Sequence, residues 1–295
     1  MGKAVADASE AARRVFEAAD AALGRPISKL CFEGPLDQLT LTANTQPALV
    51  TTSIAILAAI RERLPELAAP AFAAGHSLGE YSALVAAGAL KLDDAVRLVE
   101  LRGRAMQQAV PEGQGAMAAI LGGDAEAVLA LCDAARGADV LDAANFNAPG
   151  QIVISGSSAA VQRAAALAPE RKLKAIPLKV SAPFHCSLMV EAARVVDTAL
   201  AGVALESLAF PVVANVSAEP NQDPGRVRDL LVRQISGAVR WDRSISLMAE
   251  AGVTHALEIG PQKVLAGMVK RIDKRIRVES VSDPDGISRI PAFFD

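Results

Sequence analysis

Apolar residues recur at the spacing of amphipathic helices along much of this chain. Between residues 4 and 23, Val5, Ala12, Phe16 and Ala19 fall on one helical face. Similar patterns predict helices at 45–64, 78–88, 91–110, 124–136, 157–168, 187–202, 225–236 and 241–251, and one that starts near Val264. Short apolar runs predict strands at 71–74, 115–122, 139–147, 151–156, 173–180, 211–217 and 254–261.

The order of these elements divides the chain into two parts. Residues 113–184 are predicted to run strand-helix-strand-strand-helix-strand, which is the ferredoxin-like pattern. The flanking stretches, 1–112 and 185–295, alternate strands with helices, as chains with a mainly parallel sheet do. The sequence therefore predicts an α/β fold, in which a ferredoxin-like small domain is inserted into a core with a mainly parallel sheet.

Composition narrows the class of protein. Of the 295 residues, 52% are hydrophobic and 3% aromatic, which predicts a globular core built from Ala, Leu, Val and Ile. The net charge of −3 gives no reason to expect nucleic acid or an anionic membrane as a partner. No apolar run has the eighteen or so residues that a bilayer requires. The 3 cysteines form no CxxC pair, which fits a reducing cytoplasm.

Gly75-His76-Ser77-Leu78-Gly79 matches G-x-S-x-G, the nucleophile elbow of hydrolase-like cores. A sharp turn from strand to helix strains the serine backbone and exposes its hydroxyl at the helix N-terminus, where negative charge is favoured. The N–H of Leu78 is well placed to donate to an oxyanion. The alternative is an ordinary capping box, with Ser77 as N-cap and Glu80 three residues later.

A nucleophilic serine needs a base, and the chain has 3 histidines. His76 adjoins Ser77, where neighbouring side chains diverge, and His255 lies within an alternating strand, so a structural role is favoured for both. His185 follows the small domain in a loop that can return over the elbow, which makes it the best candidate, although elimination alone leaves the assignment open. Cys186 beside it has the pattern of a buried structural cysteine.

Two further roles are less clear from the pattern. No Asp or Glu stands where it would orient the histidine, and a backbone carbonyl can do this instead, which predicts a Ser-His dyad. Arg102 lies beside the apolar face of helix 91–110. An arginine in a charged helix is most often solvated, whereas a fixed guanidinium can bind a substrate carboxylate through two hydrogen bonds.

Seven segments together resemble one family, the malonyl-CoA:acyl carrier protein transacylases of bacterial fatty acid synthesis, from residue 1 to about 280. They are TQPAL, GHSLGEYSALVAAGAL, LVELRGRAMQ, AVPEGQGAMAAI, NFNAPGQIVISG, SAPFHCSLM and EIGPQKVL, in the order of that family. The resemblance implies transfer of malonyl from malonyl-CoA to the phosphopantetheine thiol of acyl carrier protein by a ping-pong mechanism. It implies no bound cofactor.

The same resemblance assigns roles to individual residues. Ser77 matches the acylated serine, His185 the general base and Arg102 the residue that binds the malonyl carboxylate. Gln234 matches the position whose backbone carbonyl holds the histidine, and Leu78 the donor of one oxyanion N–H. Phe184 and Leu78 together match the malonyl-selective form of the family pattern rather than the methylmalonyl form.

The sequence departs from the family at its start, because the family opens with a strand and a Gly-Gln-Gly-Ser-Gln loop that supplies the second oxyanion donor. We therefore expect the first strand of the core to be missing here, as it would be after a start codon assigned too late. Two other functions are compatible with the sequence. A serine thioesterase or other hydrolase would use the same elbow, and an inactive chain would only bind acyl carrier protein or CoA.

Overall fold

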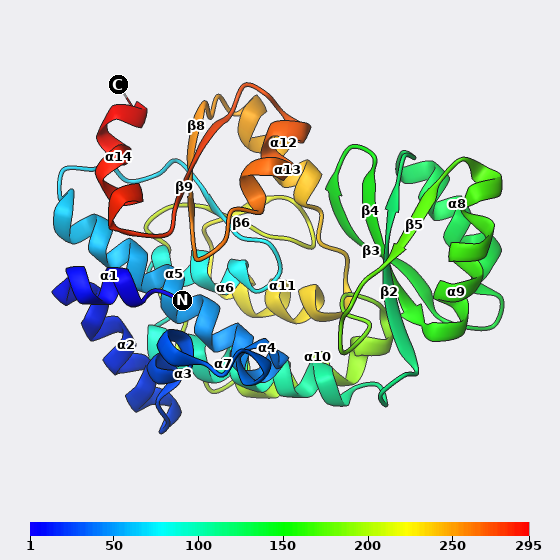
Figure 1. Ribbon diagram of the computed structural model, residues 1–295, viewed down its shortest axis with the longest axis horizontal. Coiled ribbons are helices and arrows are strands. Elements are labelled where there is room, and N and C mark those ends of the chain that lie inside the picture. Colours follow the sequence, from blue (N-terminus) through cyan, green and yellow to red (C-terminus); the bar gives the residue numbers. More distant parts are fainter. Residues whose placement is uncertain (295) are drawn as a thin grey trace.

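The computed structural model describes residues 1–294, in which five helices precede a mixture of strands and helices (Figure 1). The helices are α1 (Lys3–Ala8), α2 (Glu10–Leu23), α3 (Ile27–Glu33), α4 (Leu36–Thr40), α5 (Thr42–Arg63), α6 (Gly79–Ala86), α7 (Leu92–Gln108), α8 (Ala125–Arg136), α9 (Ser158–Leu167), α10 (Val190–Leu200), α11 (Pro224–Ser236), α12 (Trp241–Glu250), α13 (Leu265–Ile272) and α14 (Pro284–Phe294). The strands are β1 (Ala73–Ala74), β2 (Gly115–Leu121), β3 (Leu141–Ala148), β4 (Gln151–Ser157), β5 (Lys174–Pro177), β6 (Val212–Val213), β7 (Pro220–Asn221), β8 (His255–Ile259) and β9 (Arg277–Val281).

The four-stranded sheet confirms the predicted strand-helix-strand-strand-helix-strand order of residues 113–184. Its strands lie in the order β3-β4-β2-β5, and every neighbouring pair is antiparallel. Side chains of β2 alternate between two environments, as the period of a strand requires. Ala118 and Ile120 are buried under α8 and α9, whereas Met117 and Ala119 face the opposite side, where Phe184 packs against them.

The rest of the chain does not form one large parallel sheet. Its strands form two small sheets within residues 1–294, one in the order β1-β6-β7 and the other a β8-β9 pair. The pairs β1/β6 and β8/β9 are parallel, as expected, but β6 and β7 are antiparallel. Because β1, β6 and β7 are each two residues long, they cannot build a continuous sheet, and the fold is mixed α/β with several small sheets.

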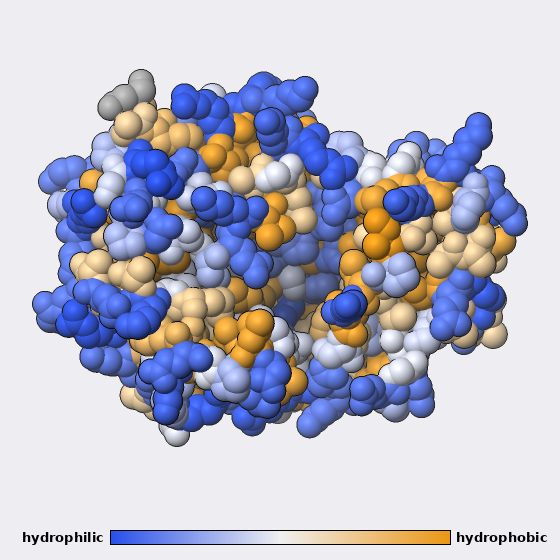
Figure 2. Space-filling model, viewed as in Figure 1, coloured by the Kyte–Doolittle hydropathy of each residue, from blue (hydrophilic) through white to orange (hydrophobic). Residues whose placement is uncertain are grey.

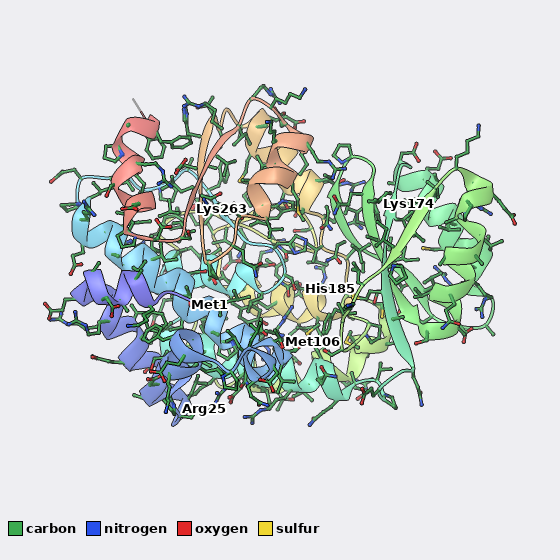
Figure 3. All side chains as sticks on the ribbon, in the orientation of Figure 1. Met1, Arg25, Met106, Lys174, His185 and Lys263 are labelled. Carbon is green, nitrogen blue, oxygen red and sulfur yellow. The ribbon has the colours of Figure 1, made fainter. Side chains whose placement is uncertain are left out.

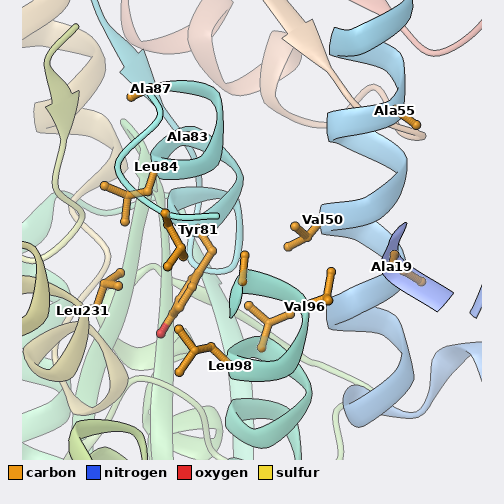
Figure 4. Close-up of a cluster of buried hydrophobic side chains, with 14 of the residues drawn as sticks. Ala19, Val50, Ala55, Tyr81, Ala83, Leu84, Ala87, Val96, Leu98 and Leu231 are labelled. Carbon is orange, nitrogen blue, oxygen red and sulfur yellow. The ribbon is translucent and has the colours of Figure 1, made fainter. Parts of the chain in front are cut away.

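Helices supply most of the main hydrophobic core. α5 packs against α2, α6 and α7, and Figure 4 shows Val50, Tyr81, Leu84 and Val96 meeting in this region. By length and composition α5 is apolar enough to cross a membrane, but 56% of its most apolar window is buried inside the molecule. Its apolar side chains thus serve the core.

Several elements differ from the sequence prediction. The expected helix at 4–23 is two helices, because Ser9 takes an extended conformation, caps α2 by accepting the Ala12 N–H, and donates its hydroxyl to Glu62. The elements α3, α4, β7, β9 and α14 were not predicted. The first four have at most 7 residues, too few for a sustained apolar period, and α14 contains Pro291, which interrupts a helical pattern.

Candidate active site

The segment 75–79 forms the predicted turn between β1 and α6. Ser77 has a φ of 51°, a left-handed conformation that is uncommon for a residue with a side chain. Gly75 is required by close packing, because a Cβ there would lie 2.0 Å from the carbonyl carbon and oxygen of Gly79. The strained turn places the Ser77 hydroxyl at the start of α6, as the elbow interpretation predicts.

Ser77 is hydrogen-bonded to His185, which the structure brings to it from a loop 108 residues away in sequence. The distance from Ser77 Oγ to His185 Nε2 is 2.7 Å, and His185 Nδ1 lies 2.9 Å from the backbone oxygen of Gln234. Because a carbonyl only accepts, Nδ1 carries the proton and Nε2 is free to accept the Ser77 hydroxyl proton. His185 is itself 4% exposed and has a φ of 59°.

Burial keeps the imidazole neutral. Desolvation, followed by the positive charge of Arg102, lowers the pKa of His185 to about 3. A histidine that is neutral at physiological pH has the free lone pair that a general base needs.

Arg102 is not a solvated arginine, because its side chain is buried with 2% of the residue exposed. Its Nη1 donates to Gln46 Oε1 at 2.7 Å, and its Nη2 donates to Gln234 Oε1 at 2.9 Å and to Ser77 Oγ at 3.0 Å. All three acceptors are uncharged. A buried guanidinium without a carboxylate partner is suited to bind an anion that arrives with the substrate.

The capping-box interpretation is wrong. No side chain caps α6, and the Ser77 hydroxyl is engaged by His185 and Arg102 instead of a backbone N–H. The backbone N–H of Leu78, the predicted oxyanion donor, makes no hydrogen bond within residues 1–294. It is therefore free to donate to a substrate oxygen next to Ser77.

Sequence reasoning missed three polar residues of the site: Gln46, Glu80 as a site residue, and Asn215. Gln46 is buried on α5 and bonds Arg102. Asn215 follows β6 and accepts the Ser77 N–H on its Oδ1 at 2.6 Å. Asn215 is a polar residue in the apolar run 211–217, and that contrast is the signal that could have identified it, whereas Gln46 and Glu80 stand among other polar residues and carry no such signal.

The other two histidines lie apart from the base position. The Nε2 of His76 is hydrogen-bonded to Asn147 of the four-stranded sheet at 2.8 Å, and the His76 ring packs against Trp241. Burial lowers the pKa of His76. His255 bonds Thr254 and Arg277 and packs edge to face against Phe293. Cys31, Cys132 and Cys186 are free and buried. No group of three or more His, Cys, Asp or Glu side chains able to hold a metal occurs within residues 1–294.

The site lies where the two parts of the molecule meet. His185 lies between the four-stranded sheet and the helical part in Figure 3. Figure 2 shows the surface hollowed between these two parts, with apolar residues on either side.

Comparisons with known proteins agree on one family. Residues 1–283 match the acyl transferase domain model. The malonyl CoA-acyl carrier protein transacylase of Bacillus subtilis is 47% identical over 289 residues, which cover 97% of this chain and 90% of that protein. The crystal structure of the acyl-carrier-protein S-malonyltransferase of Burkholderia pseudomallei superposes with a TM-score of 0.94 at 45% identity, covering 98% of this chain and 94% of that one.

A further solved structure shows a relative with its partner. It is a malonyl-transacylase in complex with a type II PKS acyl-carrier protein, with a TM-score of 0.93 and 40% identity. The match covers 98% of this chain and 93% of that chain.

Proposed function

This chain belongs to the acyl transferase family as a malonyl CoA-acyl carrier protein transacylase, and we propose that Ser77 carries the malonyl group during the reaction. The enzyme is an acyl-carrier-protein S-malonyltransferase that moves malonyl from malonyl-CoA to acyl carrier protein for fatty acid synthesis. The observation that carries the proposed role of Ser77 is the position of its Oγ, 2.7 Å from His185 Nε2 and 3.0 Å from Arg102 Nη2.

The first half-reaction forms the malonyl-serine ester. Ser77 Oγ attacks the thioester carbonyl carbon while His185 Nε2 accepts the hydroxyl proton. The Leu78 N–H donates to the oxyanion of the tetrahedral intermediate. When the carbon–sulfur bond breaks, the imidazolium returns its proton to the sulfur, and coenzyme A leaves as a thiol.

The second half-reaction reverses these steps with a different thiol. The phosphopantetheine thiol of acyl carrier protein gives its proton to His185 and attacks the ester carbonyl. The carbon–oxygen bond to Ser77 then breaks, and His185 returns the proton to Ser77 Oγ. Gln234 supplies the backbone oxygen that keeps the His185 Nδ1–H oriented through both steps.

Arg102 provides selectivity for malonyl. Its guanidinium binds the free carboxylate of the malonyl group and releases one or both glutamine acceptors as it does so. An acetyl group lacks this carboxylate. A thioesterase for neutral acyl groups would gain nothing from a buried arginine at this position, so the contacts of Arg102 favour the transferase over a hydrolase.

We also propose a division into two domains. Residues 1–112 and 185–295 form the hydrolase-like core, and 113–184 form the ferredoxin-like small domain. The separate hydrophobic cluster under α8 and α9 and the strand order β3-β4-β2-β5 support this division. The free, buried cysteines support a cytoplasmic location.

The intact mass of the protein after brief mixing with malonyl-CoA tests the proposed function. We expect a malonyl adduct that is absent in Ser77→Ala and that disappears when acyl carrier protein is added. Release of free malonate without carrier protein would identify a hydrolase. Binding of carrier protein or CoA without an adduct would identify an inactive binding chain, and either result would overturn the proposal.

A further inference from the structure

Glu80 is a buried carboxylate that the steps above do not use. It lies in the first turn of α6 with 2% of the residue exposed. Within residues 1–294, no Lys, Arg or His side chain forms a salt bridge with it. Burying a carboxylate without a cation is strongly unfavourable unless hydrogen bonds compensate. Its hydrogen bonds therefore indicate what it does.

One oxygen of Glu80 accepts two hydrogen bonds from different elements. Its Oε2 lies 3.0 Å from the backbone nitrogen of Asn215, which follows β6, and 2.8 Å from Nε2 of Gln234 on α11. Both donors belong to residues that contact the catalytic groups directly. Glu80 Oε2 thus links Asn215 and Gln234, the two residues that contact the catalytic groups.

The side chain of Asn215 is hydrogen-bonded to the elbow at two positions. Its Oδ1 accepts the Ser77 N–H, and its Nδ2 donates to the backbone oxygen of Gly75 at 2.8 Å. Because Ser77 has a strained left-handed backbone, such a clamp is needed to hold the turn. The bond from the Asn215 N–H to Glu80 fixes the backbone from which this clamp extends.

Gln234 connects Glu80 with the base and the guanidinium. Its Nε2 donates to Glu80 and to the Ser77 backbone oxygen, while its Oε1 accepts from Arg102. Because Nε2 faces two hydrogen-bond acceptors and Oε1 faces a donor, only this orientation of the Gln234 amide satisfies all three bonds. Its backbone oxygen meanwhile accepts from His185 Nδ1.

We propose that Glu80 is a positioning residue, whose ionised carboxylate holds Asn215 and Gln234 and through them aligns Ser77, His185 and Arg102 for malonyl transfer. This inference rests on the proposed function. It goes beyond the assignment of nucleophile, base and carboxylate-binding residue, because Glu80 touches neither the substrate nor the reacting atoms.

The surroundings of Glu80 make its ionisation observable. Burial raises its pKa to about 7, opposed by the bonds from Gln234 and Asn215 and by the charge of Arg102. The charged or titratable groups facing it are Arg102 from α7, Tyr81 from α6 itself and, across Gln234, His185. The remaining wall, from α6, α11, β6, β7 and the β6–β7 connection, is not titratable: Leu84, Val212, Ala214, Asn221, Val227 and Leu230.

Glu80→Gln tests the inference because it keeps the shape and an acceptor oxygen but removes the charge. At saturating malonyl-CoA, we expect wild-type Ser77 acylation to accelerate as pH rises through about 7, when Glu80 ionises. The variant should lack this acceleration and acylate about tenfold more slowly above it, because bonds to a charged acceptor are roughly twice as strong. The KM for malonyl-CoA should change less than the rate constant.

Stability separates positioning from a structural role. A carboxyl group with a raised native pKa loses its stabilising contribution as pH rises through that pKa, and glutamine has no such loss. Above neutral pH the variant should therefore be at least as stable to urea as the wild type, although it is slower. A variant that is slow only because it is less stable, or that keeps the wild-type pH dependence, would overturn the inference.

Glu100→Gln is the matched control, because Glu100 is a partly buried carboxylate on α7 that pairs with Arg25 and Arg104, away from the elbow. It should leave the acylation rate and its pH dependence unchanged. If the wild type itself forms no adduct at Ser77, the proposed function fails. If the wild type forms the adduct at a rate that does not depend on pH in the neutral range, only the proposed role of Glu80 fails. This outcome is measured on the wild type alone, so it does not require Glu80→Gln to fold.

Discussion

At the scale of single residues, Arg102 is a charged side chain whose burial is unfavourable by itself and is retained because the charge binds the substrate. Its guanidinium donates to neutral acceptors, and its Nε has no hydrogen-bond partner within residues 1–294. Tyr81 packs against it with 5.6 Å between the guanidinium carbon and the ring centroid. Burial raises the energy of the charge when substrate is absent, the nearby Glu80 offsets part of this cost without pairing with it, and an incoming carboxylate lowers it further.

Replacing Arg102 should change substrate selection. We expect Arg102→Ala to reduce kcat/KM for malonyl-CoA by about 10- to 100-fold, the equivalent of one charged hydrogen-bonding contact. The ratio of acetyl to malonyl transfer should rise, because acetyl never used the guanidinium. Competing transfer from the two CoA thioesters measures this ratio.

Arg104→Ala provides the control for that experiment, since Arg104 lies on the same helix and is exposed. It should leave the ratio unaltered. Equal losses for both thioesters in Arg102→Ala would show that Arg102 acts only by maintaining the shape of the site.

At the scale of elements, the elbow depends on the approach of β1 to the first turn of α6. Gly75 and Gly79 flank the serine, but only Gly75 is confined by its neighbours. A Cβ on Gly79 would meet nothing within 4 Å, whereas a Cβ on Gly75 would collide with the Gly79 backbone. Close packing therefore requires the glycine at position 75 but not the one at position 79.

The two glycine-to-alanine variants should therefore behave oppositely. Gly75→Ala should lower the free energy of unfolding by more than about 4 kcal/mol, the range of severe steric change, or prevent folding. Gly79→Ala should be neutral or raise it by up to about 1 kcal/mol, because alanine favours a helix more than glycine does. Urea unfolding of both proteins measures the contrast, and similar losses would contradict it.

The elements also show where sequence patterns are sufficient. The helices at 92–108 and 125–136 were predicted to within a few residues because each has a long apolar period set by burial of one face, and the helix at 42–63 because its apolar stretch is too long for a strand. β7, with two residues, carries no period of its own and is a strand only because β6 supplies its hydrogen-bond partners. The strand predicted at 211–217 is shortened to the two residues of β6.

At the scale of the whole molecule, the site depends on contacts between its two parts. Phe146 N donates to Val239 O, and Val239 N donates to Ala144 O, which joins β3 to the segment before α12. His76, next to the nucleophile, bonds Asn147 on the same strand. These contacts hold the four-stranded sheet against the turn at residues 75–79. They thereby set the hollow between the two parts of the molecule.

Removing the side chain of Asn147 tests this connection. Asn147→Ala should lower the free energy of unfolding by about 1–3 kcal/mol, the cost of leaving the partly buried Nε2 of His76 without its partner. Burial lowers the pKa of His76, and the bond to Asn147 partly offsets this by raising it, so the loss of stability in the variant should grow as pH falls below the ordinary range of histidine. Urea unfolding at several pH values measures both effects, and unchanged stability would refute the role of this contact.

The sequence by itself determined the long helices and the four-stranded sheet of residues 113–184. It also led to the five proposed site residues, of which Ser77, Leu78 and His185 were first suggested by local patterns. Ser77 was proposed because a strained turn needs a glycine beside it, and His185 because few bases were available, although these patterns alone left both assignments open; Leu78 follows from the same turn. The resemblance to a family then implied the roles of all five residues, and for Gln234 and Arg102 it was the main argument. All of this information is local or already contained in a family pattern.

Only the tertiary structure decided which polar residues surround the reacting groups. Gln46, Glu80, Asn215 and Gln234 come from separate segments and meet around Ser77 and Arg102. Glu80 has the sequence position of a helix cap, but its carboxylate turns inward to Asn215 and Gln234. Hydrogen bonds between residues more than 130 positions apart have no local pattern, so a sequence alone does not predict them.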